Sequence, residues 1–187
     1  MLQAMRCIPA AQGLAAPLLK RAASLTLDWD LRQKSRFECS DSQGRSVAVF
    51  LPRGQVLRGG DALLTQDGTL LRVLAAPQAV LRISACPRQG QPLDLARAAY
   101  HLGNRHVPTE LQAQWLQIEP DHVLAEMLTH MGLHLVSLQA PFEPEAGAYG
   151  HQTRSGAAAH AHAHAHAHPH AHPPPHAHAH GCAHDHG

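Results

Sequence analysis

The chain has 187 residues, a net charge of +1 with histidine neutral, and a charged fraction of 16%. This length fits one domain or two small ones, and nothing in the charge balance indicates the basic stripe that nucleic-acid binding requires. Aromatic residues make up only 4%, so the cores are built on Leu, Val and Ala, and dimerisation is a common remedy for cores this small. No apolar run approaches the roughly 18–20 residues of a membrane span. We therefore expect no nucleic-acid partner and no membrane partner.

The numbers and positions of histidine and cysteine indicate which metal-binding motifs and which cellular compartment to expect. The chain has 18 histidines, and 12 of them lie between His160 and His186. The cysteines Cys7, Cys39, Cys86 and Cys182 are widely separated and form no Cys-x-x-Cys pair, which excludes a zinc ribbon or a thioredoxin-like motif. Scattered free cysteines favour a reducing compartment. We expect a cytoplasmic protein.

The first half of the chain predicts a small β domain. Residues 1–23 are Ala-rich with an interrupted apolar pattern, and we expect a disordered extension rather than a signal peptide. Short alternating runs then follow at 24–27, 36–39 and 47–51. Asp67-Gly68 joins two further apolar runs and favours a hairpin, because its turn requires positive φ. Residues 24–77 are therefore predicted to form an antiparallel β domain.

The second half predicts a different arrangement over residues 78–150. A strand is expected at 79–85 and a helix at 92–102, with Gly103 as its left-handed stop. Two short strands are expected at 107–111 and 116–118. Asp121 is a predicted N-cap of a helix that Gly132 ends, and a last strand begins at His134. The order strand-helix-strand-strand-helix-strand is typical of a ferredoxin-like fold, so the whole chain is assigned to the α+β class.

The tail, residues 151–187, consists mainly of His, Ala and Pro. It has too little bulky apolar surface to offset its ordering entropy, so we expect disorder without metal. Neutral imidazoles bind nickel, copper and zinc, so the tract is expected to hold several ions, with binding that weakens below about pH 6.5. A cloning tag is the alternative, but tags are usually contiguous histidines, and this tract alternates with Ala. The candidate ligands are His160, His162, His164, His166, His168, His170, His172, His176, His178, His180, His184 and His186, with Cys182 either an added thiolate ligand or an incidental thiol.

Among the residues before the tail, His106 is the strongest candidate for a metal ligand. It follows the predicted helix stop, where the scaffold holds a side chain and leaves it open to a ligand. One histidine makes no selective site, but two copies of His106 can face each other across the axis if the protein is a two-fold dimer. A simple helix cap is the alternative. His101, one turn earlier, is a candidate ligand or a packing residue, and Arg105 and Asn104 are candidates for orienting His106, although Asn104 also suits a left-handed turn position.

Further candidates lie on the second helix and just beyond the core. His122 shares a helix face with Glu126 and His130, a spacing that holds a metal between turns but also describes any solvated face. Asp121 beside it adds a carboxylate. His134 is expected to be structural, and His151 is a candidate ligand, because it follows the core closely enough to be able to fold back toward the dimer axis.

Several of these segments together resemble one known family. The run His-Leu-Gly-Asn-Arg-His at 101–106, Leu-Pro-Arg-Gly at 51–54, Gly-Gly-Asp at 59–61, Asp-His-Val-Leu at 121–124 and the Pro-Phe-Glu-Pro-Glu-Ala-Gly-Ala-Tyr-Gly run at 141–150 are similar to the urease accessory nickel chaperones, the UreE family. The resemblance implies a partner-binding β domain and a ferredoxin-like homodimerisation domain. It also implies an interfacial Ni²⁺ site at His106, and as partners an accessory GTPase and apo-urease. Family members often carry His-Asp-His where this chain has Pro120, so a peripheral site here would have only His122.

The sequence leaves one alternative function open. A histidine-rich nickel or zinc store explains the tail equally well, although it does not explain the form of residues 103–110. A metallohydrolase is excluded because no His-Glu-x-x-His cluster is present, so we expect no enzyme activity and no organic cofactor. Cu²⁺ binds most histidine sites more tightly than Ni²⁺. The nickel assignment therefore rests on the resemblance, with Zn²⁺ or Cu²⁺ also expected to bind in vitro.

Overall fold

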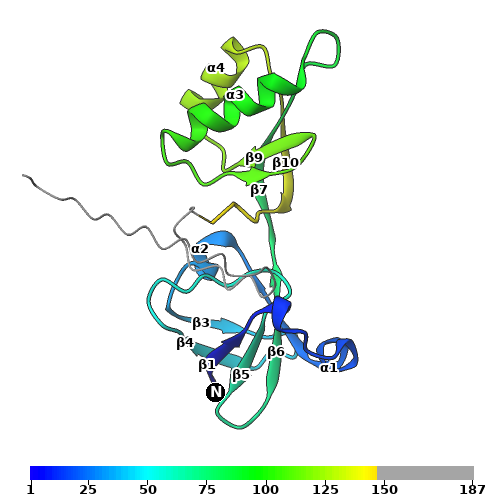
Figure 1. Cartoon of the computed structure of the whole chain (residues 1–187). Coiled ribbons are helices and arrows are strands. Elements are labelled where there is room, and N and C mark those ends of the chain that lie inside the picture. Colours follow the sequence, from blue (N-terminus) through cyan, green and yellow to red (C-terminus); the bar gives the residue numbers. More distant parts are fainter. Residues whose placement is uncertain (147–187) are drawn as a thin grey trace, which may run out of the picture. The chain divides into compact units, whose positions relative to one another are not determined.

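The computed structural model describes residues 1–146, which form two β-sheets and several helices (Figure 1). The α+β class predicted from the sequence is confirmed. Within this described part, no helix is both long and apolar enough to span a membrane. The predicted tail and its histidines lie outside the described residues.

The first sheet has six strands in the order β2-β6-β5-β1-β4-β3. Its alternating residues bury one aliphatic face, on which Val47, Leu63, Leu71 and Val73 are fully buried. A period of two residues places every second side chain on that face. The elements are β1 (Leu2–Ile8), η1 (Ala10–Gln12), α1 (Ala16–Arg21), β2 (Ala23–Leu27), α2 (Trp29–Arg32), β3 (Arg36–Ser40), β4 (Ser46–Phe50), β5 (Ala62–Thr65) and β6 (Leu70–Ala75).

Strand β1 corrects the prediction for residues 1–23. It lies between β5 and β4, and its Ala4 is fully buried. The expected disordered extension is therefore wrong for this segment. The register of β1 against β5 shifts between Ala4 and Arg6. Such a bulge interrupts the alternation by which a strand is identified in a sequence.

The strand pairing corrects a second expectation, because the sheet is mixed and not antiparallel. β1 pairs with β4, and β2 with β6, in parallel. Hydrophobic alternation locates strands but does not specify their partners. The predicted hairpin is confirmed: β5 and β6 pair antiparallel, and Gly68 between them has a φ of 84°.

The second sheet is antiparallel throughout, in the order β10-β7-β9-β8. Helices α3 and α4 cover one of its faces (Figure 1). The core between them holds the fully buried Ile83, Ala98, Leu102, Ile118 and Leu128. The elements are β7 (Pro77–Ser84), α3 (Pro92–Gly103), β8 (Glu110–Leu111), β9 (Trp115–Ile118), α4 (His122–His130) and β10 (His134–Pro141).

The helix boundaries follow local chemistry. The Asp94 carboxylate accepts the backbone N–H of Gln91 at 2.7 Å, at the start of α3. Asp121 is the N-cap of α4, as predicted, and accepts the N–H of Leu124 at 2.9 Å. Gly132 has a φ of 79° just past the end of α4, also as predicted. The strand expected at 107–111 is shorter, because the chain from Gly103 to Val107 is used to terminate α3.

Candidate metal centre

Helix α3 ends in a turn that places His106 in an unusual backbone conformation. The N–H of Val107 donates to the carbonyl of Leu102 at 3.1 Å, and the N–H of His106 donates to that of Gly103 at 2.9 Å. These two bonds make a Schellman motif, whose left-handed C′ residue is usually glycine. Here that residue is His106, with a φ of 56°, the only non-glycine residue with positive φ in residues 1–146.

This geometry corrects two details of the prediction. Gly103 is not the left-handed stop, because it is the last helical residue of α3 and has no positive φ. Asn104 is not left-handed either, since its φ and ψ are −63° and −17°. A left-handed non-glycine residue costs about 1–2 kcal/mol. Strain of this kind concentrates at functional sites, and here it falls on the strongest candidate ligand.

The His106 side chain is exposed, on the wall of an open cavity of about 430 Å³. The cavity walls come from α3, the loop at 106–109, β8, the Trp29 ring and residues 144–146. Most of this lining is apolar, including Ala99, Val107 and Leu111. The imidazole is therefore accessible to an ion or to a second protein surface.

The neighbours of His106 support the helix end. The Arg105 guanidinium donates to the carbonyl of His101 at 3.1 Å, which satisfies an acceptor in the last turn of α3. His101 is half-buried, and its ring lies edge-on to Tyr100 with centroids 5.4 Å apart. Arg105 thus binds neighbouring backbone, as expected, at His101.

The α4 candidates remain separate single ligands. The Asp121 carboxylate is engaged by its capping bond, and His122 is exposed. One ring nitrogen of His130 lies 2.8 Å from the Glu126 carbonyl. In residues 1–146 no three His, Cys, Asp or Glu side chains come together as a metal site. His134 lies in β10, opposite Ser84, and is exposed. His151 and the tail candidates from His160 to His186 lie outside the described residues.

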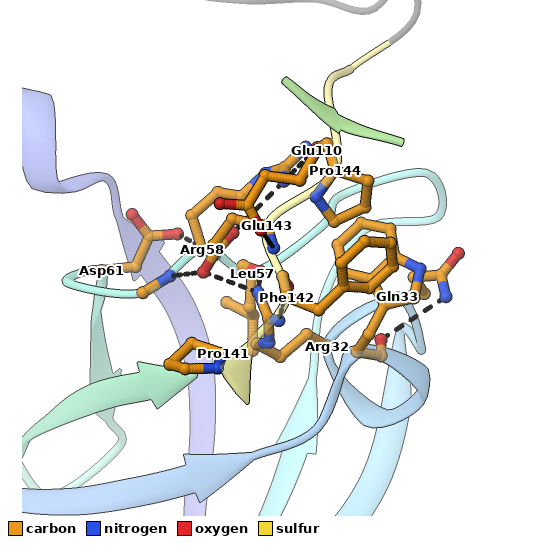
Figure 2. A network of polar contacts seen from close by, with 12 residues as sticks. Arg32, Gln33, Leu57, Arg58, Asp61, Glu110, Pro141, Phe142, Glu143 and Pro144 are labelled. Atoms are coloured by element: carbon orange, nitrogen blue, oxygen red, sulfur yellow. Dashed lines mark hydrogen bonds and ion pairs between the residues drawn. The ribbon is translucent and has the colours of Figure 1, made fainter. Parts of the chain in front are cut away.

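A polar network holds the segment after β10 in place (Figure 2). The Glu143 carboxylate accepts bonds from Arg32 at 2.8 Å, from Arg58 at 3.2 Å and from the Gly59 N–H at 2.7 Å. Arg32 is fully buried and also donates to the carbonyl of Phe142. Glu143 therefore neutralises a buried guanidinium, which would otherwise be costly to keep from water.

The same network continues to the loop that carries His106. Arg58 donates to the carbonyl of Pro144 at 2.6 Å, and the N–H of Glu145 donates to the carbonyl of Thr109 at 2.9 Å. Residues 143–145 are thus fixed three residues from His106 along the loop. The Pro-Phe-Glu-Pro-Glu run is recognisable in the sequence, but nothing in its pattern indicates a role for Glu143. Arg32 and Glu143 are 111 residues apart, and no spacing rule joins them.

The described cysteines differ in reactivity. Burial, the nearby charge of Asp61 and a hydrogen bond to it raise the pKa of Cys7 to about 12. Burial, and then the charge of Asp41, raise the pKa of Cys39. Backbone N–H groups of Arg88 and Gln89 lower the pKa of Cys86. Cys7 is therefore a protonated thiol at neutral pH and a poor metal ligand.

Comparison with known proteins covers nearly the whole chain. Residues 4–76 match the model of the UreE urease accessory protein N-terminal domain, and residues 78–186 match that of its C-terminal domain. The urease accessory protein UreE of Paracidovorax citrulli is 64% identical over 80% of this chain and 71% of its own. That of Methylibium petroleiphilum is 64% identical over 79% and 66%. That of Verminephrobacter eiseniae is 58% identical over 86% and 95%.

The two domain models follow one another in the order that the structure's two sheets take along the chain. The boundary between the models falls beside Pro77, where β7 begins. The chain therefore belongs to the UreE family of urease accessory proteins.

Proposed function

We propose that this protein is a nickel metallochaperone that delivers Ni²⁺ for assembly of the urease active site. The observation that carries the proposal is the exposed imidazole of His106, held on strained left-handed backbone at the end of α3. A pure helix cap would need only glycine at that position. The strain is understandable if the side chain binds cargo, and nickel is the cargo that the urease accessory role of its relatives favours.

One imidazole requires partners, and a second copy of the chain supplies the first of them. Leu93, Ala96, Tyr100 and Gly103 follow one another along the exposed side of α3, at helical spacing. Leu93 is 53% exposed and Tyr100 is 67% exposed. An apolar stripe that leads to His106 suits an isologous two-fold interface, which brings two copies of His106 to one axis. We propose a homodimer built on this stripe.

The remaining ligands come from elsewhere in the chain. His151 adds a further ligand to the interfacial site, and the tail from His160 to His186 holds further ions as a reservoir. His101, His122 and Asp121 are secondary ligands at most, because the Asp121 carboxylate is already bonded to the helix start. Zn²⁺ and Cu²⁺ bind the same imidazoles in vitro.

The wider assignment also belongs to this proposal. The strand order β10-β7-β9-β8, with α3 and α4 on one face, supports a ferredoxin-like metal-binding and dimerisation domain. The six-stranded sheet is then the partner-binding domain. The partners are the accessory GTPase and apo-urease in the cytoplasm. No catalytic step is assigned to the chain.

Equilibrium dialysis with Ni²⁺ tests the site. The full chain, a chain stopped after Gly150, and that shorter chain with His106→Ala are compared, with Zn²⁺ and Cu²⁺ in parallel. We expect the shorter chain to keep one tight ion per two chains and His106→Ala to lose it. No tight binding by the shorter chain would refute a site complete within residues 1–150.

A second measurement separates a chaperone from a store. Nickel-loaded protein is mixed with the accessory GTPase, and the transfer of the ion is followed. A chaperone releases the ion on contact, at a rate that rises with GTPase concentration. A store releases it only at its own slow dissociation rate, whatever the GTPase concentration, and that result would favour storage or detoxification.

A further inference from the structure

The face of the first sheet that points away from its core carries apolar side chains on four neighbouring strands, β4, β1, β5 and β6. Successive side chains of a strand alternate between its two faces. Phe50, Leu64 and Leu70 each stand next to a fully buried residue of the aliphatic core along the chain. All three therefore lie on the outward face, where Phe50 is 40% exposed.

Two strand registers bring Leu64 and Leu70 into line with β1. Leu70 of β6 pairs with Leu64 of β5, which pairs with Arg6 of β1. The bulge in β1 adds Met5 at this level, so Met5 and Arg6 are both exposed although they are consecutive. Bulges can re-aim a side chain in this way. The Gln66 side-chain amide donates to the Met5 sulfur at 2.8 Å, which fixes the position of that side chain.

The other side of β1 continues the same line. β1 and β4 pair in parallel with Ala4 beside Val49, so the next residues, Met5 and Phe50, are neighbours. Phe50 pairs in turn with Arg36 of β3. Figure 1 shows these strands of the first sheet side by side. Together the aligned side chains form an outer row, which consists of Arg36, Phe50, Met5, Arg6, Leu64 and Leu70.

The outward face carries an excess of positive charge. Arg6 and Arg36 are exposed, and neither forms an ion pair within residues 1–146. Arg72 alternates with core residues of β6 and adds a third guanidinium to this face. Glu38 is the only acidic residue in the strands of this sheet. Such a face attracts an acidic partner and repels a second copy of itself.

The spacing of the outer row matches the side chains of a helix. Neighbouring strands lie about 4.8 Å apart, so the four apolar side chains span about 14 Å. Side chains on one face of a helix are about 5–6 Å apart, and three helical turns cover about 16 Å. An extended peptide repeats its face at about 6.6–6.8 Å, which fits less well. The row therefore favours a helix of about three turns that crosses the strands.

We propose that the outer row is the docking site for an amphipathic helix of a partner protein, with acidic residues on both flanks of its apolar stripe. This docking rests on the partner-binding role proposed above for the six-stranded sheet, and it involves no residue of the metal site. A lipid surface fits the row less well, because Leu64 and Leu70 are half-buried, whereas interfacial binding buries apolar side chains about 5–10 Å deep.

Methyl NMR on the full chain tests the docking. Of the four methionines, Met5 lies in the outer row, and Met127 and Met131 pack against the core of the second sheet. The probe is a synthetic helix, stapled on its solvent side, with leucine at i, i+4, i+7 and i+11 and glutamate on both flanks. We expect this probe to shift the carbon-13 methyl resonance of Met5, which Met5→Leu assigns, and to leave those of Met127 and Met131 in place.

Three charge substitutions locate the bound probe. We expect Phe50→Glu to weaken binding about tenfold or more, because it replaces a central apolar side chain with a charge of the same sign as the probe. Arg36→Glu should weaken binding about threefold to tenfold, and added salt should reduce this difference. Val123→Glu is the matched control, since Val123 is 59% exposed on α4 and lies outside the row. Its affinity should stay unchanged. If Phe50→Glu fails to fold, Arg36→Glu decides.

Four outcomes would overturn the docking. The Met5 resonance may stay in place at saturating probe, or a probe with lysine flanks may bind equally well. Vesicles of mixed zwitterionic and anionic phospholipid may shift Met5 when the probe does not, which would make the row a lipid-binding surface. A Met5 shift that follows protein concentration alone would mean that a second copy covers the face. None of these outcomes bears on nickel binding at His106, which dialysis decides separately.

Discussion

At the scale of single residues, the conformation of His106 is the most informative feature. Sequence reasoning selected this residue from its place after a helix, but it assigned the left-handed position to Gly103. Residue preference favoured Gly103 for the left-handed position, because glycine is the usual C′ residue. The helix instead continues through Gly103, and the hydrogen bonds of His106 and Val107 close it three residues later. Where a helix ends depends on packing that a sequence pattern does not contain.

Replacing His106 by glycine should separate stability from function. We expect His106→Gly to stabilise the metal-free protein by about 0.5–1 kcal/mol, because it relieves left-handed strain at some entropic cost. The same variant should lose tight nickel binding. Urea denaturation and dialysis measure the two effects. His101→Gly is the control, and it should destabilise by about 1 kcal/mol because His101 lies within α3. If His106→Gly instead lowered the free energy of unfolding, the backbone at His106 would not be strained.

The two cysteines of opposite pKa shift should alkylate in a fixed order. The raised pKa of Cys7, about 12, leaves almost no thiolate at mildly alkaline pH, whereas the lowered pKa of Cys86 increases its thiolate fraction. We expect iodoacetamide to modify Cys86 well before Cys7, as followed by peptide mass spectrometry. In urea the difference should disappear. Equal rates in the folded protein would contradict the assigned environments.

At the scale of elements, the sequence predicted the helix ends and the turn that depend on a few neighbouring residues. The N-cap Asp121, the stop at Gly132 and the hairpin at Gly68 all depend on a few neighbouring residues, and the structure confirms them. The pairing of β2 with β6 depends on residues far apart along the chain. β1 was missed because its bulge hides the alternation.

Two glycines at helix ends make a matched test. Gly132 has a φ of 79°, so Gly132→Ala should destabilise the protein by about 1 kcal/mol. Gly103 is helical, and an added Cβ there would meet nothing within 4 Å. Gly103→Ala should therefore stabilise the metal-free protein by about 0.5–1 kcal/mol. Thermal or urea unfolding measures both, and equal effects would argue against the end of α3 described here.

At the scale of the whole molecule, one carboxylate links segments that are distant in sequence. Glu143 accepts bonds from Arg32, Arg58 and Gly59. The sequence motif marked the region, but its role became visible only when these partners were placed together. The sequence therefore predicted His106 as the central candidate of the site. It did not predict the residues that surround His106, because their contacts join segments far apart along the chain.

Removing the Glu143 charge should lower the free energy of unfolding. Glu143→Ala leaves the fully buried Arg32 guanidinium without its carboxylate, and because Glu143 is 30% exposed we expect a loss of about 1–3 kcal/mol in unfolding free energy. Glu145→Ala is the matched control, since the described contacts of Glu145 use its backbone N–H. Its effect should stay within about 0.5 kcal/mol. Equal losses would show that the network contributes little.

The central place of β1 also has a consequence for synthesis. Residues 2–8 leave the ribosome well before the two strands on either side of β1, which lie at 46–50 and 62–65. The nascent sheet cannot grow outward from its first strand. It must wait until Thr65 has emerged before β1 has both neighbours, and such long-range pairing is intrinsically slow. Until then the apolar side chains and the unpaired edges of β1 are exposed, and exposed segments of this kind are prone to aggregation.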